Sequence, residues 1–198
     1  MKIILASTSK PRAQLLRQIC PNFETMAPDV DESPLINETA HDLVTRLAQK
    51  KAEAIAAHHP EAIVIGADQV AWLNQKIQGK LHTFEAAKKW LEQASGETAE
   101  FVSGMAITGP NHSTEVTTTI TRVKYRKLSS NQIDYYLKTE QPFNAAGAMH
   151  IEGLGIMLAE QVKSDDPSAM LGLSLTKLTM MLQHRGVDLL SQTPQNDP

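Results

Sequence analysis

The chain opens with a short apolar run that stops abruptly at three hydroxyl residues. The run, residues 3–6, has the length of a buried strand, and residues 11–19 carry apolar side chains at helical spacing. Between them, Ser9 is placed to cap the helix and Pro11 to occupy its first turn. This order of residue types predicts a buried strand, a tight loop and a helix.

The loop between this strand and this helix suits an anion. Hydroxyl groups, free backbone N–H groups and the positive end of a helix dipole all favour negative charge there. Lys10 and Arg12 add full positive charge at the same place. The sequence therefore predicts a phosphate-binding loop close to the N-terminus.

Strand and helix patterns alternate along the rest of the chain, as in α/β proteins. We expect a single domain, residues 1–190, with a central mixed β-sheet flanked by helices and an active-site cleft at the carboxyl ends of strands. The polar, proline-bearing tail 191–198 is expected to be disordered. The predicted strands are 2–6, 62–67, 100–107 and 116–124, and the predicted helices are 11–19, 40–58, 84–94, 130–138 and 173–184.

Composition and charge exclude several classes of partner. A hydrophobic fraction of 41% with 21% charged residues is ordinary for a globular protein. The net charge of -3 argues against non-specific binding of nucleic acid, which needs a basic surface. The chain shows no apolar run of membrane-spanning length and no signal-peptide core, so we expect a cytoplasmic protein. Cys20, the single cysteine, is expected to be a small buried apolar residue.

The helical pattern over residues 40–58 has a lysine in its apolar stripe. On a helical projection Lys51 falls near the middle of that stripe, where burial of an amine is unfavourable unless it reaches an anion or the surface. The pattern alone leaves two interpretations open. Either the long stem carries the amine to solvent, or the amine points into a cleft at a phosphate or a carboxylate.

Three acidic residues form a second unusual group. Asp68 directly follows the apolar run 62–67, and ligands of α/β sheets gather at such strand ends. A carboxylate there could hold a metal or activate water, although a capping or turn role is more common. Asp31 and Glu32 lie in an acidic loop that by itself reads as a solvated surface. Together with Asp68, this loop supplies the oxygen ligands that Mg²⁺ requires.

Eight short sequence motifs follow one another between the first predicted strand and about Leu189. As a set they resemble the motifs of the Maf family of nucleoside triphosphate pyrophosphatases, whose α/β fold is akin to that of the inosine triphosphatases. Any one of them alone is a weak signal. They are Leu5–Ser9 with Arg12, Val30–Glu32, Leu47–Ala52, Ile65–Gln69, Gly79–Lys80, Ala94–Gly96, Ala146–Ala148 and Glu152–Gly155.

The resemblance implies hydrolysis between the α- and β-phosphates of a nucleotide, which gives a monophosphate and pyrophosphate. It implies that Asp68 is the general base and that Glu32 is an essential acidic residue, and we expect these two carboxylates to hold a divalent cation, Mg²⁺ or Mn²⁺. It also implies a homodimer with a nucleoside triphosphate as substrate. The phosphate pocket that it implies consists of Ser7, Ser9, Arg12, Lys51 and Lys80.

Two further positions point to a subgroup of that family. Relatives acting on dTTP and UTP commonly have threonine where this chain has Gln69, and glutamine where it has Glu152. The pair found here is similar to the subgroup that prefers 7-methyl-GTP. Methylation at N7 makes guanine positively charged, so a carboxylate in the base pocket favours it. The alternative for Glu152 is an exposed loop charge.

The chain departs from the family pattern at several positions. Lys10 and Pro11 alter the usual Ser-Pro-Arg-Arg loop, and Ala13 stands where the subgroup has a second arginine. Either one phosphate contact is lost or Lys10 replaces it. Leu81 and Ser174 stand where prolines are usual, which bears on loop rigidity.

Two other functions stay open at this stage. One is a pyrophosphatase of dTTP, UTP or other modified nucleotides. The other is a nucleotide-binding regulator of cell division with little turnover. A binder without catalysis could lose Asp68 or Glu32 freely, and this chain keeps both, so the enzyme is favoured.

Overall fold

The computed structural model describes residues 2–191, so residues 192–198 of the predicted tail lie outside the described residues. A mixed seven-stranded sheet has the strand order β2-β1-β3-β5-β6-β7, and β4 pairs with β3 at one side. The strands are β1 (Ile3–Ala6), β2 (Glu24–Met26), β3 (Ile63–Leu73), β4 (Lys76–Gln78), β5 (Thr98–Gly109), β6 (His112–Tyr125) and β7 (Ala159–Ser164). The helices are α1 (Lys10–Ile19), α2 (Ala40–Ala56), α3 (Phe84–Ala94), α4 (Ser130–Glu140) and α5 (Leu175–Gln183), with 3-10 helices η1 (Leu154–Leu158) and η2 (Pro167–Leu171).

The predicted α/β architecture is confirmed. All five predicted helices and all four predicted strands are present, with ends that shift by a few residues. The predictions missed β2 and β4, which have three residues each, and β7, whose side chains are mostly exposed and so form no apolar run. Cys20 is buried, as expected. No helix within residues 2–191 has both the length and the apolar character needed to cross a membrane.

Strand β3 continues beyond Asp68, so the prediction that it ends there is wrong. β5 pairs with β3 along nearly its whole length and supports it past this point. On the other edge, β1 pairs with β3 only as far as Gly66, and β4 pairs only from Ala71 onward. Among the described residues, the edge of residues 67–70 therefore has no strand neighbour, and we call this gap the notch. Asp68 still lies beyond the carboxyl end of β1, its parallel neighbour.

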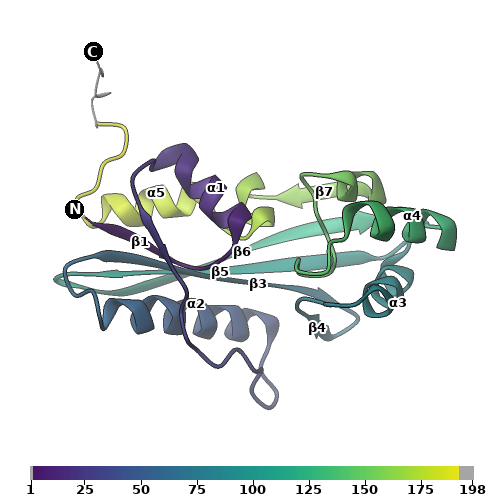
Figure 1. Ribbon diagram of the computed structural model, residues 1–198, viewed down its shortest axis with the longest axis horizontal. Coiled ribbons are helices and arrows are strands. Elements are labelled where there is room, and N and C mark those ends of the chain that lie inside the picture. Colours follow the sequence, from purple (N-terminus) through teal and green to yellow (C-terminus); the bar gives the residue numbers. More distant parts are fainter. Residues whose placement is uncertain (1, 192–198) are drawn as a thin grey trace.

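The two faces of the sheet are covered by different helices (Figure 1). α2 packs on one face, against side chains such as Val64 and Ala106. α1 and α5 pack on the other face at the end near β1, and α3 and α4 pack at its opposite end. Between these two clusters the second face carries a polar row, in which Gln69, Ser103 and Thr119 pair across β3, β5 and β6.

Two glycines let α2 lie close against the sheet. A Cβ atom on Gly66 would lie 2.1 Å from the carbonyl oxygen of Ala48, and one on Gly104 would lie 2.4 Å from that of Val44. Any side chain at these positions would push the helix outward. The close approach matters for the site, because Lys51 of α2 then reaches β3.

Candidate active site

A cleft of about 620 Å³ lies at the notch, beside the carboxyl end of β1. This volume is in the range of about 300–1,000 Å³ that is typical of small-molecule sites. The predicted position at a strand end is correct for β1, while β3 passes through the site. The lining brings together residues that are far apart in the chain: residues 6–12, Ala27, Pro28, Glu32, Lys51, Gln69, Lys80, residues 144–146, Met149, His150, Glu152, Met170 and Leu171.

The cleft has a positive balance of charge although the whole chain carries -3. Among the described residues its walls include four cations but only two carboxylates, Glu32 and Glu152. Such a lining suits a polyanion such as a triphosphate. The four cations are Lys10, Arg12, Lys51 and Lys80.

The N-terminal loop has the predicted form. The side chain of Ser9 caps α1 by accepting a hydrogen bond from the Arg12 backbone N–H at 3.4 Å, and Ser7 Oγ accepts from the Ser9 N–H at 3.1 Å. The Arg12 guanidinium donates to the carbonyl of Gly172 at 3.1 Å. Burial lowers the pKa of Arg12, and the nearby Asp68 and Glu32 oppose this effect. Arginine still stays charged at neutral pH, so the loop presents a fixed cation to the cleft.

Lys51 points at carboxylates and not at solvent. The residue is 5% exposed, and its Nζ donates to Asp68 Oδ1 at 2.6 Å and contacts Glu32 Oε1 at 2.8 Å. The interpretation that its stem carries the amine to solvent is therefore wrong. A buried lysine between two carboxylates is compensated in charge. The arrangement joins α2, β3 and the acidic loop at one point.

The two acidic loop residues have different surroundings. Burial favours the neutral form of Glu32, but the hydrogen bond from Lys51 and the charges of Lys51, Lys80 and Arg12 lower its pKa below the ordinary value. Glu32 is therefore ionised at neutral pH. Asp31 Oδ1 instead accepts from the backbone N–H of Ser33 at 2.9 Å. Of the pair, only Glu32 lines the cleft.

Gln69 is held in one orientation. Its Nε2 donates to Ser103 Oγ at 2.9 Å and to the carbonyl oxygens of Ala169 and Met170 at 3.0 and 3.1 Å. Carbonyl oxygens can only accept, so these contacts assign the amide nitrogen. Oε1 has no donor among the described residues and is not a buried unpaired atom. Because Gln69 lines the cleft, this oxygen is the part of the amide that remains to accept a hydrogen bond from a ligand.

Lys80 and Glu152 reach the cleft from two loops that are joined to each other. Lys80 forms an isolated β-bridge with Ala146, in the segment that leads to Glu152. That segment is anchored to α4, because Glu140 Oε2 accepts from the Leu154 N–H at 3.0 Å. Glu152 itself is exposed on the cleft wall. The fold thus places both charges at the same cavity.

Eight of the nine predicted site residues line the cleft, and the ninth, Asp68, lies behind Lys51 without lining it. Ser103 was missed. It lies below Gln69 and donates to the carbonyl of Ala169 at 2.8 Å. A hydroxyl within the apolar run of β5 was the signal that could have revealed it. Lys10, considered as a replacement for the missing arginine, does line the cleft.

A hydrogen-bonded aspartate supports the segment that holds Gln69. Asp166, 2% exposed, accepts hydrogen bonds from Ser168, from the hydroxyl of Ser174 at 2.6 Å and from Thr176. Burial tends to raise the pKa of Asp166, but these hydrogen bonds lower it to about 2. Ser174, where a proline is usual, therefore stabilises η2 through a hydrogen bond that proline could not make.

The acidic residues of the site fit a divalent cation that also binds the substrate. Residues 2–191 contain no group of three or more His, Cys, Asp or Glu side chains placed to hold a metal ion. Glu32 and Asp68 nevertheless contact one cation already, the Lys51 ammonium. Mg²⁺ sites commonly use one or two carboxylates together with substrate phosphates. Two converging carboxylates beside a polyanion cleft meet that requirement.

The profile of the Maf family, described as Maf-like protein, matches residues 2–185. This chain belongs to the Maf family. Among its curated relatives, the 7-methyl-GTP pyrophosphatase of Bordetella pertussis is 44% identical over 193 residues, 98% of this chain and 96% of that protein. The 7-methyl-GTP pyrophosphatase of Nitrosococcus oceani is 44% identical over 190 residues, 95% of each chain. The resemblance drawn from the ordered motifs is confirmed.

Solved structures share the fold of this Maf-family chain. The Staphylococcus aureus Ham1 protein superposes with a TM-score of 0.55 at 17% identity, over 93% of this chain and all 100% of that one. The HAM1 protein from Coxiella burnetii gives a TM-score of 0.53 at 13% identity, over 93% and 99% of the two chains. At such low identity the likeness concerns the fold alone, and it agrees with the predicted α/β architecture.

Proposed function

We propose that this Maf-family protein hydrolyses the bond between the α- and β-phosphates of nucleoside triphosphates, with 7-methyl-GTP as its substrate. The observation that carries the proposal is the group of Lys51, Asp68 and Glu32 beside a cleft lined with cations. The cations suit the triphosphate, and the carboxylates suit a metal and a water molecule. The identity of 44% to proteins named 7-methyl-GTP pyrophosphatase supports the same reaction and substrate.

In the proposed reaction Asp68 is the general base. Its carboxylate accepts a proton from a water molecule whose oxygen attacks a phosphorus of the α–β linkage. The bond from that phosphorus to the bridging oxygen breaks, and the pair of electrons leaves with the other product. Arg12, Lys51 and Lys80 offset the negative charge that develops on the leaving group. Ser7 and Ser9 hold the phosphates at the N-terminus of α1.

Glu32 and Asp68 are the proposed ligands of a divalent cation, Mg²⁺ or Mn²⁺. When bound with the triphosphate, the cation supplies charge that neutralises phosphate oxygens. Lys51 then pairs with phosphate, because its present partners are engaged with the metal. The two carboxylates must be ionised for this, which agrees with the lowered pKa of Glu32.

Gln69 and Glu152 form the proposed base pocket. The fixed Oε1 of Gln69 accepts hydrogen bonds from base N–H groups, and guanine offers such donors. The Glu152 carboxylate attracts the positive charge that N7 methylation gives the base. This combination favours 7-methyl-GTP over ordinary purine or pyrimidine nucleotides.

Pyrophosphate release from a panel of nucleoside triphosphates tests the proposal. The panel contains 7-methyl-GTP, GTP, dTTP and UTP, each with Mg²⁺ or Mn²⁺. Wild type is compared with Asp68→Asn and with Asp31→Asn, a matched change at the acidic residue that does not line the cleft. General acid–base catalysis contributes about 10²–10⁴-fold, so Asp68→Asn should lose activity on that scale while Asp31→Asn keeps it.

The panel also separates the alternatives. Preference of wild type for 7-methyl-GTP, together with loss of turnover in Asp68→Asn, supports the whole proposal. Turnover of dTTP and UTP, without turnover of 7-methyl-GTP, supports the proposed reaction but contradicts the proposed base pocket. If wild type binds nucleotide tightly without turnover, the proposal that it is an enzyme is wrong and a nucleotide-binding regulator is favoured.

Three finer expectations are part of the same proposal. The enzyme is expected to be a homodimer, to act in the cytoplasm and to form its domain from residues 1–190. Sedimentation equilibrium tests the dimer, because a monomer mass at micromolar concentration would contradict it. A chain truncated after residue 190 should unfold at the same temperature as the full chain.

A further inference from the structure

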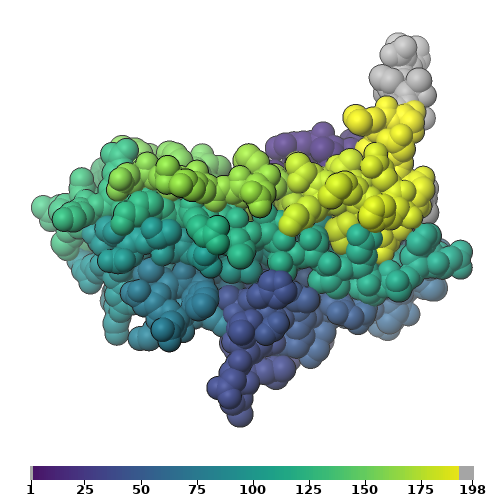
Figure 2. Space-filling view, turned by 180° about the vertical axis from the view of Figure 1, so that it is seen from behind, coloured from purple at the N-terminus to yellow at the C-terminus, as the bar shows by residue number. Residues whose placement is uncertain are grey.

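The loop that carries Glu32 projects from the body of the protein. It connects β2 to α2, and it protrudes at the lower edge of Figures 1 and 2. At its tip Ile36 is 94% exposed and Leu35 is 58% exposed. A loop with an exposed apolar tip gains little from packing, so other contacts must hold its shape. Glu32 belongs to the same loop and lines the cleft.

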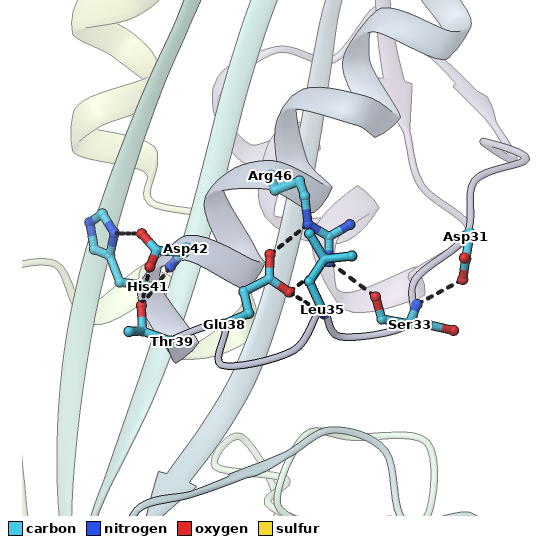
Figure 3. Close-up of polar contacts among 8 residues, drawn as sticks. All are labelled: Asp31, Ser33, Leu35, Glu38, Thr39, His41, Asp42 and Arg46. Atoms are coloured by element: carbon cyan, nitrogen blue, oxygen red, sulfur yellow. Dashed lines mark hydrogen bonds and ion pairs between the residues drawn. The ribbon is translucent and has the colours of Figure 1, made fainter.

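An arginine of α2 holds the loop from outside the cleft (Figure 3). Arg46 Nε pairs with Glu38 Oε1 at 2.5 Å, and Arg46 Nη2 pairs with Glu38 Oε2 at 2.7 Å. This is the two-pronged geometry that makes arginine–carboxylate pairs strong. The two side chains are only 18% and 6% exposed. We call this pair the clasp.

The clasp also fixes the loop backbone. Arg46 Nη2 donates to the carbonyl oxygen of Ser33 at 3.1 Å, and Glu38 Oε2 accepts from the backbone N–H of Leu35 at 2.9 Å. Ser33 directly follows Glu32 in the chain. The hydrogen bond from Arg46 holds the pKa of Glu38 at about 2 against the opposing effect of burial. The clasp therefore stays ionised at every pH at which the protein would work.

α2 thus grips the loop at two separate points. Lys51 contacts the Glu32 side chain inside the cleft, and Arg46 contacts the Ser33 backbone outside it. Neither Arg46 nor Glu38 lines the cleft. In the proposed reaction Lys51 turns to phosphate and releases Glu32. The clasp is the contact that remains.

We propose that Arg46 and Glu38 are positioning residues that keep Glu32 in place for metal binding when Lys51 engages the substrate. This inference rests on the proposed function, in which Glu32 is a metal ligand. The physical reason is entropy: a loop fixed in advance loses less conformational freedom when its carboxylate binds. Partners that orient metal ligands typically change metal affinity by about 10–100-fold when they are removed.

The test compares Arg46→Met and Glu38→Gln with a matched control. The control is Arg122→Met, which breaks the pair of Arg122 Nε with Glu100 Oε1, 2.9 Å apart, between β6 and β5. With 7-methyl-GTP as substrate, both clasp variants should raise the Mg²⁺ concentration for half-maximal activity about tenfold. The KM for the nucleotide at saturating Mg²⁺ should change less than twofold. Arg46→Lys keeps the charge but cannot make the two-pronged contact. Its Mg²⁺ dependence should therefore lie between that of wild type and that of Arg46→Met.

A second readout does not need turnover. Amide hydrogen exchange over residues 31–38 should be faster in Arg46→Met and Glu38→Gln, with the central strands unchanged. Mn²⁺ binding, followed by electron paramagnetic resonance with a nucleotide present, should weaken about tenfold in the same variants.

The outcomes separate this inference from the proposed function. Unchanged Mg²⁺ dependence, together with unchanged exchange and Mn²⁺ binding, overturns the positioning role. An equal effect in Arg122→Met also overturns it, because the change would then be general. If wild type hydrolyses no nucleotide, the proposed function fails, and weaker Mn²⁺ binding in the clasp variants would still support positioning.

Discussion

Asp68 and Gln69 are neighbours in β3, yet their side chains bond on opposite faces of the sheet. Asp68 contacts Lys51 of α2, whereas Gln69 donates to the carbonyls of η2 on the other face. Alternation along a strand produces this split. At the notch, where this edge of β3 is unpaired, Gln69 lines the cleft and Asp68 lies behind Lys51, which does line it. In the proposed function one strand thus supplies a carboxylate for chemistry and an amide for recognition.

The base pocket can be tested by its charge. Glu152→Gln should lower the preference for 7-methyl-GTP over GTP, measured as the ratio of kcat/KM values, by about tenfold because the favourable charge contact is lost. Gln69→Thr should lower it as well, since the amide acceptor is removed. Glu160→Gln, at an exposed carboxylate on β7, is the control and should change nothing. An unchanged ranking in both pocket variants would show that the pocket is misassigned.

Ser103 should act on recognition through Gln69. Ser103→Ala removes the hydroxyl that accepts from Gln69 Nε2 and donates to Ala169. Each such hydrogen bond is worth about 1 kcal/mol, so discrimination between 7-methyl-GTP and GTP should weaken several-fold while kcat changes little. Ser113→Ala, at an exposed position of β6, is the comparison. Steady-state kinetics with 7-methyl-GTP and GTP measure this discrimination. A loss of kcat alone would contradict a role of Ser103 in recognition.

The contact between α2 and β3 should tolerate no side chain at Gly66. Gly66→Ala places a methyl group 2.1 Å from the Ala48 carbonyl oxygen, so α2 must move. Overpacking of this kind destabilises proteins by about 1–3 kcal/mol, and Lys51 would also lose its fit to Asp68. Gly79→Ala is the matched control, because no atom lies within 4 Å of the added methyl group. Urea unfolding measures both. Equal stability of the two variants would show that α2 adapts freely.

The acid stability of the protein should depend on Asp166. Its pKa is about 2 in the folded protein, below the ordinary 3.8. A depressed pKa gives stability that is complete above pH 3.8 and is lost as the pH falls toward 2. The contribution is about 2 kcal/mol. Asp166→Asn should therefore lower the free energy of unfolding at pH 7 and flatten its decline in acid.

Asp165→Asn, at the exposed neighbouring position, is the comparison for this measurement. Unfolding by urea between pH 7 and pH 2.5 gives the two curves. A wild-type curve parallel to that of Asp166→Asn across this range would contradict the prediction.

Local signals in the sequence were enough to predict many elements. The strand, loop and helix at the N-terminus follow from an apolar run, a capping serine and a proline within ten residues. The long helix follows from its apolar stripe, and Lys51 was conspicuous within that stripe for the same reason. Lys51, Asp68 and the hydroxyls of the N-terminal loop, Ser7 among them, were singled out from the residues, while Lys80, Gln69 and Glu152 depended on the family resemblance.

Other features depend on contacts that no local pattern contains. The continuation of β3 past Asp68 results from its pairing with β5, more than thirty residues later. Ser103 became a candidate only when β5 placed it beside Gln69. The clasp was equally hidden, because Glu38 and Arg46 read as ordinary charges of a loop and a helix.

The sequence by itself determined the local features that suit the proposed chemistry. These are a capped helix start, a lysine in an apolar stripe, and carboxylates after apolar runs. These follow from side-chain chemistry and backbone periodicity over a few residues. The tertiary structure alone decided which partner each charge has, and on which face of the sheet it acts. That choice depends on strand pairing and on the close approach of α2 at Gly66 and Gly104, which are interactions between distant parts of the chain.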